Sequence, residues 1–339
     1  YIANNQSSNG TLDIAVMSKQ PLKQVDKILI SNLQSPNLYT VGDLLIVTGQ
    51  DLRNANFAIK VYDTKDKTNL IHEYQLSSQP VDSRMIGNKL FVVLQEPLQQ
   101  RLALPYPNKA DLQGSFEQFA TKLNLDGMFD FGPDTLAGIK CSAMIKIQAI
   151  SDQLQFQRVI SYDVAQGAVL DEVAIPGSDS GIYMTDKTLY SYGTVTLPPT
   201  WINPLDTPAQ QAYIAAAAQA ADTLVIKKVS LDPETGKLTP NAVGKVAGHL
   251  KAFNGQWAFH EIDQSNDTLL SVVTTTGDVR DETGANPASN HLTVLKQTGT
   301  ALEAAAQLAD FGTKEDVRSV RYVGNYAYVV TFKRTDPLF

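Results

Sequence analysis

The chain has 339 residues, and 28 Lys and Arg stand against 35 Asp and Glu, which gives a formal net charge of −7. An acidic chain offers no basic surface to the phosphates of nucleic acid, so a nucleic-acid partner is not expected. Hydrophobic residues make up 43%, as in globular proteins, and no window holds the roughly 18 apolar residues that a spanning helix needs.

The single cysteine, Cys141, cannot form an internal disulfide. A charged fraction of only 19%, together with the many Gln, Asn, Thr and Ser residues, favours a secreted bacterial protein. The chain begins at Tyr1, without Met or a signal segment, so we expect a mature or trimmed fragment whose targeting segment has been removed. The expected location is therefore extracytoplasmic: secreted, periplasmic or at the cell surface.

The first candidate strands are residues 1–3 and 11–16. After them, short β-rich runs joined by tight turns recur along the chain, and the flanking Val, Ile, Tyr and Phe favour extended backbone. Gly-Asp and Gly-Asn at several of these turns supply the positive φ that hairpins between twisted strands require. The predicted hairpins are residues 38–47, 84–93, 182–190 and 321–330, with a looser copy at 257–274.

A second pair of strands follows each complete hairpin at a variable distance. These pairs are 57–63 with 71–76, 159–164 with 170–175, 224–231 with the segment after Gly236, and 291–295 with 302–308. The repeating unit is thus four antiparallel strands, which predicts an all-β fold, a β-propeller built of four-stranded blades. A pair of β-sandwiches is the alternative, but sandwiches do not repeat the same turn at the same strand position.

The ends of the chain lie within blades. Four complete blades are expected between a partial N-terminal blade and a final hairpin that leads to residues 336–339. The two partial blades either join into a shared closing blade, which gives a five-bladed ring, or belong to a larger ring. The domain prediction is one β-propeller over residues 1–339, or the N-terminal part of a larger one.

Three long insertions separate the second and third strands of consecutive blades, at residues 95–153, 197–222 and 278–290. This topology puts them on one face of the propeller, where long loops on a rigid scaffold commonly carry function. A capping box at Thr207 with Pro208 predicts a helix over 208–221. A second helix is predicted after Asp111 from apolar residues at helical spacing. The helices either form a lid or merely extend the rim.

Arg84 and Arg321 occupy the same place in their hairpins, three residues before the turn glycine, as does Tyr39. Tyr183 takes this place by analogy in a hairpin whose turn has no glycine. Repetition favours a structural role, in which the guanidinium pairs with a carboxylate of a neighbouring blade. Candidate carboxylates end the equivalent third strands, at Asp63 and Asp163. The functional alternative is a ligand-binding ring in the channel.

The insertion that contains Trp201 offers an aromatic side chain in a Pro-rich segment. Trp201, with Tyr213, is a candidate for stacking on a sugar or anchoring a peptide. The alternative is that Trp201 packs on its own helix at Tyr213, because tryptophan is highly buried on average.

Metal binding has little support in the sequence. The four histidines show no ligand spacing, so we expect neither a zinc site nor a cofactor. Three aspartates in the first insertion, Asp126, Asp130 and Asp134, offer oxygen ligands for calcium, but they fit no EF-hand pattern, so a solvated loop is the preferred interpretation.

Three segments carry a resemblance to a known family: residues 82–93, 272–277 and 319–339. There the chain resembles secreted bacterial and archaeal proteins with a β-propeller domain distantly related to WD-type repeats. The resemblance implies an extracytoplasmic, often membrane-anchored protein. In that family the stretch matching 335–339 continues into further blades, which implies the N-terminal part of a larger propeller. It supplies no activity and no catalytic residues.

No catalytic constellation is recognised, so the sequence favours a protein that is not an enzyme. We expect a binding or assembly module that holds a protein or polysaccharide on the insertion-bearing face. The rival hypothesis is a polymer-directed hydrolase of the glycosidase kind, with carboxylates at the channel mouth. A third reading is calcium-dependent adhesion through the Asp-rich insertion.

Overall fold

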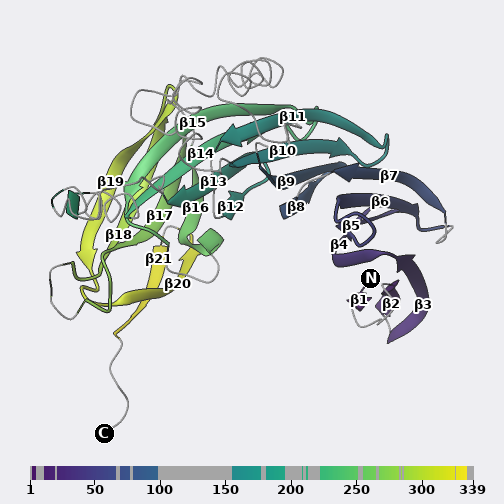
Figure 1. Ribbon diagram of the computed structural model, residues 1–339, viewed down its shortest axis with the longest axis horizontal. Coiled ribbons are helices and arrows are strands. Elements are labelled where there is room, and N and C mark those ends of the chain that lie inside the picture. The colour runs from purple at the N-terminus through teal and green to yellow at the C-terminus, as the bar shows by residue number, and fades with distance from the viewer. Residues whose placement is uncertain are drawn as a thin grey trace, which may run out of the picture. The chain divides into compact units, whose positions relative to one another are not determined.

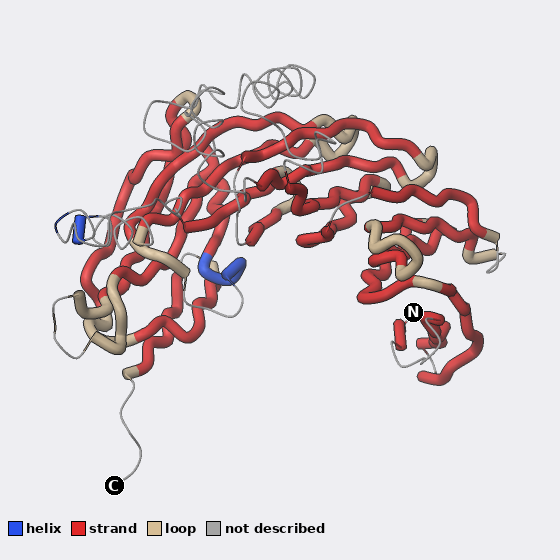
Figure 2. The backbone as a smooth tube through the Cα atoms, viewed as in Figure 1, coloured by secondary structure: helices blue, strands red, loops and turns tan. Residues whose placement is uncertain are grey.

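The computed structural model describes most of the chain outside the long insertions, and it consists almost entirely of strands there (Figure 2). The described residues are 2–4, 11–19, 21–65, 69–76, 79–97, 155–176, 181–194, 208, 211–212, 222–250, 255–264, 267–281, 284, 286–324 and 326–333. The chain divides into two compact units. Unit 1 comprises 1–101, 155–175 and 231–238, and unit 2 comprises 102–154, 176–230 and 239–339.

Unit 1 contains three antiparallel sheets, each with its strands in chain order (Figure 1). The first sheet has three strands: β1 (Ile2–Asn4), β2 (Thr11–Lys19) and β3 (Leu22–Ser31). The second has four: β4 (Leu33–Val41), β5 (Leu44–Asp51), β6 (Phe57–Asp63) and β7 (Leu70–Leu76). The third has four: β8 (Gln79–Ile86), β9 (Lys89–Pro97), β10 (Gln155–Asp163) and β11 (Ala168–Pro176).

Unit 2 repeats the four-stranded pattern twice and ends in a hairpin. The first group is β12 (Gly181–Met184), β13 (Thr188–Thr194), β14 (Thr223–Leu231) and β15 (Leu238–Ala247). The second is β16 (Phe259–Gln264), β17 (Asp267–Thr276), β18 (Ser289–Thr298) and β19 (Ala301–Phe311). The hairpin is β20 (Asp316–Val323) and β21 (Tyr326–Phe332). The predicted all-β fold of four-stranded antiparallel sheets is confirmed.

The two groups of unit 2 join through their outermost strands. β15 and β19 run parallel where Val243 pairs with Ala301 and Gly244 with Leu302. The eight strands therefore form one sheet in the order β12-β13-β14-β15-β19-β18-β17-β16. A Cβ added to Gly244 would lie 2.6 Å from both the Cβ and the carbonyl oxygen of Leu302, so this close approach depends on glycine.

Tight turns define the hairpins, as the sequence predicts. Gly42, Gly87 and Gly324 have φ of 54°, 58° and 56°, the left-handed conformation that glycine adopts without steric cost. The turn between β12 and β13 uses another device, because the hydroxyl of Thr185 accepts hydrogen bonds from the backbone N–H of Lys187 and Thr188. Equivalent hairpins therefore form with two kinds of turn, one with a left-handed glycine and one with a threonine hydroxyl that binds the backbone.

Hydrophobic clusters fill the space between successive sheets of each unit. In unit 1, one cluster joins β1–β3 to β4–β7 and includes Ile14 and Leu45, and another joins β4–β7 to β8–β11 and includes Ile59 and Ile160. All four side chains are inaccessible to solvent, and burying each stabilises the fold by roughly 1.5–3 kcal/mol. Packing between sheets is what holds each unit together.

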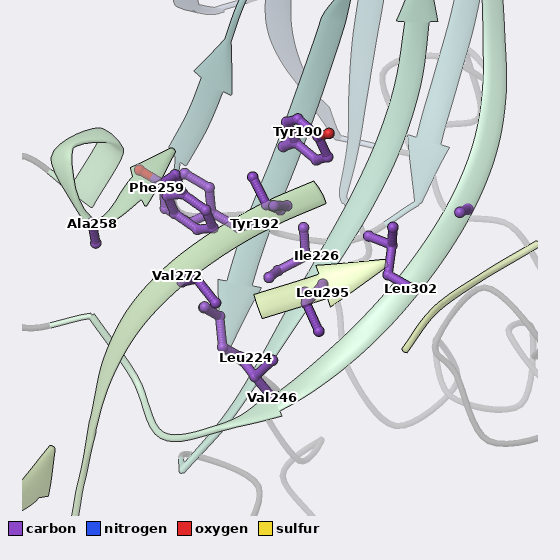
Figure 3. Close-up of a cluster of buried hydrophobic side chains, with 12 residues drawn as sticks. Tyr190, Tyr192, Leu224, Ile226, Val246, Ala258, Phe259, Val272, Leu295 and Leu302 are labelled. Carbon is purple, nitrogen blue, oxygen red and sulfur yellow. The ribbon is translucent and has the colours of Figure 1, made fainter. Parts of the chain in front are cut away.

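Among the described residues of unit 2, a large hydrophobic cluster lies between its two four-stranded groups (Figure 3). Tyr192 from β13 and Phe259 from β16 meet there with ring centroids 4.5 Å apart. Ile226 and Leu295, from the third strand of each group, complete the contact and are fully buried. A smaller cluster with Val273, Val317 and Val320 packs the β20–β21 hairpin against the second group.

The predicted helical insertions are not supported. Within 208–221 the structure describes Pro208, Gln211 and Ala212; their backbone is helical, but all three are exposed. A short helix in water depends on a packed face, and the described residues of this segment show none. The segment after Asp111 lies outside the described residues. Among those that are described, no helix is long and apolar enough to cross a membrane.

Candidate functional site

Tyrosine hydroxyls join the first strands of successive four-stranded groups. In unit 1 the hydroxyl of Tyr39 on β4 donates to the carbonyl oxygen of Ser83 on β8 over 2.6 Å. In unit 2 the hydroxyl of Tyr183 on β12 accepts from the backbone N–H of Glu261 on β16 over 3.1 Å. The position shared by Tyr39 and Tyr183 is therefore a structural contact, as its repetition in the sequence suggests.

A groove of about 350 Å³ lies in unit 2 between the second four-stranded group and the β20–β21 hairpin. Its apolar wall comes from Ile262, Leu292 and Val294, all half-buried. His260 and Ser271 add polar atoms, and residues at the turn of the hairpin complete the lining. We call this cavity the β21 groove.

Tyr322 organises the polar side of the β21 groove. Its ring stacks on His260, with centroids 4.7 Å apart and planes 16° from parallel. Its hydroxyl donates to the carbonyl oxygen of Ala258 over 3.1 Å and lies 3.2 Å from the Oγ of Ser271. Burial raises the pKa of Tyr322 to about 12, so the hydroxyl stays a proton donor at neutral pH.

Arg321 lies next to this cluster and packs on an aromatic side chain. Its guanidinium carbon is 4.5 Å from the ring centroid of Trp257, which is 47% exposed. One guanidinium nitrogen also donates to the carbonyl oxygen of Val320. Arg84 is exposed on β8 of unit 1. Whether Arg84 and Arg321 bind a ligand stays a prediction.

The carboxylate of Asp163 has a cationic partner from its own sheet. The Nζ of Lys89 lies 2.6 Å from Asp163 Oδ2, and both side chains are almost inaccessible to solvent. Burial raises the pKa of Asp163, but hydrogen bonds from Lys89 and from the backbone N–H of Gln166 and Ala165 outweigh it, and the net pKa is lowered. The other candidate, Asp63, accepts from the backbone N–H of Lys65.

A histidine–aspartate pair lies at the end of unit 2 from which the second and third insertions emerge. His249 Nδ1 is 2.7 Å from Asp222 Oδ1, and the second carboxylate oxygen accepts from the backbone N–H of Gly277 over 2.9 Å. Asp222 immediately precedes β14, whereas Gly277 immediately follows β17. One carboxylate therefore joins the end of the second insertion to the start of the third.

Asn290 continues this polar network toward the hairpin. Its amide oxygen accepts from the hydroxyl of Thr275 over 2.7 Å, and its amide nitrogen donates to the carbonyl oxygens of Gly312 and Glu315. Asn290 is fully buried, and both ends of its amide are paired, which makes the start of β18 rigid. Within the described ranges no group of three His, Cys, Asp or Glu side chains could hold a metal ion.

Several predicted site residues lie outside the described residues: Trp201, Tyr213, Asp126, Asp130 and Asp134. Sequence reasoning did not single out Trp257, His260 or Tyr322, which the structure brings together. The only local signal was that Tyr322 follows the repeated arginine position. Their contacts depend on how one sheet is staggered on the next.

Comparison with solved structures finds β-propellers of low similarity. The Dbp5 complex with Nup159 and Gle1 of S. cerevisiae matches at 8% identity and a TM-score of 0.37, over 89% of this chain and 60% of the other. Hsv2 of Kluyveromyces lactis matches at 10% and 0.38, over 96% and 65%. The β-propeller domain of the Trilobed protease from Pyrococcus furiosus matches at 10% and 0.35, over 97% and 76%.

This chain therefore spans less than two thirds of the length of the first two of these structures. No curated protein matches the sequence. The family comparison gives a clear result, since the model described as "Beta propeller domain" matches residues 1–339. The chain belongs to the Beta propeller domain family.

Proposed function

We propose that the protein is an extracytoplasmic binding or assembly module that holds a protein or polysaccharide partner on its insertion-bearing face. The observation that carries this proposal is the contact of Asp222 with both His249 and the backbone of Gly277. It fixes the end of one insertion beside the start of the next. Loops held by a rigid scaffold are where propellers and other repeat folds place their variable binding surfaces.

The energetics of the contact support a defined surface. The Asp222 and His249 side chains are 25% and 22% exposed, so their hydrogen bond is partly shielded from competing water and contributes about 1–2 kcal/mol. An isolated antiparallel β-bridge between His249 and Thr275 adds two backbone hydrogen bonds next to the His249–Asp222 contact. The bases of the two insertions therefore keep a fixed spacing, which lowers the entropic cost of binding a partner across them.

The test is capture of a binding partner by the whole chain. The labelled protein is applied to a glycan array, and the immobilised protein is incubated with surface proteins of the source organism. A variant in which residues 199–220 are replaced by a Gly-Ser linker is tested in parallel. We expect selective binding by the unaltered chain and its loss in the variant, with circular dichroism confirming that the sheets remain. Equal binding by both forms would contradict the proposal.

A second candidate function is a polymer-directed hydrolase, which the His249–Asp222 pair favours. A carboxylate that holds one imidazole nitrogen leaves the other to exchange a proton with a substrate, the arrangement used in general acid and base catalysis. Hydrolysis of a polysaccharide panel, abolished by His249→Gln with the fold intact, would favour the enzyme. The absence of products at every polymer would favour the binding module.

Calcium binding through Asp126, Asp130 and Asp134 stays a further proposal, since these residues lie outside the described part of the chain. Thermal unfolding with calcium and with chelator tests it, because a ligand of the folded state raises Tm. The extracytoplasmic location is tested by fractionation of the source cells.

A further inference from the structure

The two arms of the third insertion meet closely at its base. β17 ends at Thr276 and β18 begins at Ser289, and these two residues lie opposite each other in the antiparallel pair. The next residue, Gly277, approaches the other arm so closely that an added Cβ would lie 2.5 Å from the carbonyl oxygen of Pro287. We call this place, residues 276–278 with 286–291, the base of the third insertion.

A buried histidine joins the two arms at this base. His291 is the third residue of β18 and is only 9% exposed. Its Nε2 lies 3.0 Å from the hydroxyl oxygen of Thr276, and this hydroxyl donates to the carbonyl oxygen of Ser289 over 3.4 Å. Both hydrogen bonds form together when the imidazole is neutral and its proton is on Nε2. The bonding pattern therefore assigns this tautomer to His291.

The other ring nitrogen of His291 has no partner. Nδ1 is buried, and within the described part of the chain no donor or acceptor reaches it. A neutral imidazole leaves only an uncharged lone pair there. A protonated imidazole would bury both an N–H group without an acceptor and a positive charge without a counter-ion, which is far more costly. The closed base therefore favours the neutral form of His291.

The segments around His291 offer no group that compensates a proton on Nδ1. The residue opposite His291 on β17 is Thr274, whose hydroxyl donates to the carbonyl oxygen of Ala247. The carboxylate of Asp310 on β19 accepts from the hydroxyl of Ser289. The charged side chains of the neighbouring segments are exposed or have other partners. They are Asp222, Lys245, Asp278, Asp310, Glu315 and Asp316.

His249, the other histidine at this end of unit 2, is placed differently. Its Nδ1 lies 2.7 Å from Asp222 Oδ1, so a proton taken up by this imidazole is compensated by the carboxylate. Charge strengthens such a hydrogen bond. A fall in pH therefore reinforces the contact of His249, whereas it opposes the buried position of His291.

We propose that His291 is a pH-sensitive latch, which holds the base of the third insertion closed while its imidazole is neutral and opens the base when the imidazole takes up a proton. In the open form the ring is in water, where histidine ionises near about pH 6.5. The open form then binds one proton more than the closed form. The closed form is therefore fully stable above this pH, and it becomes less stable as pH falls, by up to about tenfold per pH unit.

The latch gives the insertion-bearing face a response to mild acid. A partner that contacts the third insertion would be held less firmly as the pH falls from neutral toward about 5.5. This consequence rests on the proposed function. The opening of the base does not, because it follows from the burial and hydrogen bonding of His291 alone.

Hydrogen exchange of the whole chain tests the latch without any partner. The reporter is the amide of Asp278, which donates to the carbonyl oxygen of Asn286 across the base over 3.0 Å. Between pH 7.5 and pH 5.5 ordinary carboxylates stay ionised. We expect the protection factor of this amide to fall about tenfold over this range. The amides of β13, in the other four-stranded group of unit 2, are the reference and should change by less than about twofold.

Two variants assign the effect to one histidine. His291→Gln keeps a side-chain N–H that reaches toward Thr276 but does not titrate, so the protection of Asp278 should vary by less than about twofold over the same range. His249→Gln is the matched control. It removes the other imidazole at this end of the unit and should lower protection by a similar factor at every pH, with the fall of about tenfold retained.

If His291→Gln does not fold, ring-nitrogen NMR of the unaltered chain replaces it. The ring of His291 should then be neutral at pH 7.5, with its proton on Nε2. Three results would overturn the proposal: protection of Asp278 that is independent of pH, a pH dependence that disappears in His249→Gln, and a charged His291 ring in the closed form. These measurements involve no partner, so failure of the latch is distinguishable from failure of the proposed function.

Discussion

The hydroxyl of Tyr39 lies 2.6 Å from the carbonyl oxygen of Ser83 and 2.8 Å from the Oγ of the same residue. The two residues belong to the first strands of neighbouring sheets, so this contact joins the sheets at the edge where each begins. Burial is the main reason that the pKa of Tyr39 is raised, which keeps the hydroxyl protonated. Removing the Tyr39 hydroxyl therefore measures how much this hydrogen bond between sheets contributes to the free energy of unfolding.

Tyr39→Phe should lower the free energy of unfolding by about 1 kcal/mol, because the hydroxyl leaves and the ring stays. Urea unfolding followed by circular dichroism measures the change. Tyr74→Phe is the control, since Tyr74 is half-buried and contributes a ring contact with Tyr162. A control change as large as that of Tyr39→Phe would contradict the role given to the hydroxyl.

Lys89→Met should be the most destabilising of these substitutions, at about 3 kcal/mol, because it leaves the Asp163 carboxylate buried without its cation. The pKa of Asp163 is lowered in the folded protein, so the carboxylate stabilises the fold above its ordinary pKa and this contribution is lost as pH falls. In the variant, burial instead raises that pKa. The stability difference should therefore be largest near neutral pH and should narrow in acid.

Urea unfolding of both proteins between pH 7 and pH 3 tests this dependence. Lys187→Met, an exposed lysine of the β12–β13 turn, is the control and should change stability by less than about 0.5 kcal/mol. A difference between Lys89→Met and the unaltered chain that grows toward acid would show that the sign is wrong.

When tyrosine ionisation is followed by absorbance at alkaline pH, Tyr322→Phe should remove one tyrosine that ionises at high pH. Burial raises the pKa of Tyr322 to about 12, above the ordinary value near 10. The neutral hydroxyl therefore stabilises the fold up to about pH 10, and this stability is lost as the pH rises toward about 12. Loss of an early-titrating phenol instead would contradict the burial of Tyr322.

Arg321→Ala should change the fluorescence of Trp257, because the guanidinium lies 4.5 Å from its ring centroid. The chain has two tryptophans, so the experiment uses a Trp201→Phe background. The cost in stability should be only about 0.5–1 kcal/mol, as for other exposed cation–π contacts. Arg318→Ala, whose guanidinium lies over Phe332, is the control and should leave the tryptophan spectrum unchanged.

The sequence is most informative where structure is local. Gly42, Gly87 and Gly324 identify their turns because the left-handed backbone is a property of single residues. The sequence pattern did not predict β3 (Leu22–Ser31), because polar residues at 23, 24, 26 and 27 interrupt the alternation that is typical of a strand. Pairing with β2 forms that strand, and such pairing is not visible in a single segment.

The candidate site depends on register and stagger, which explains why little of it could be predicted. Asp163 was expected to pair with an arginine of a neighbouring blade, but Lys89 lies directly opposite it on the paired strand. The stack of His260 on Tyr322 likewise joins residues 62 positions apart on separate sheets. A pattern along one strand identifies which residues face the core, but it does not give their partners.

The parallel contact of β15 with β19 has a consequence for cooperativity. Because Val243–Ala301 and Gly244–Leu302 unite two four-stranded groups, opening one group exposes the outer edge of the other. These eight strands share one hydrogen-bonded sheet and a common hydrophobic core. Their amides should therefore exchange hydrogen with a single opening free energy, as one foldon.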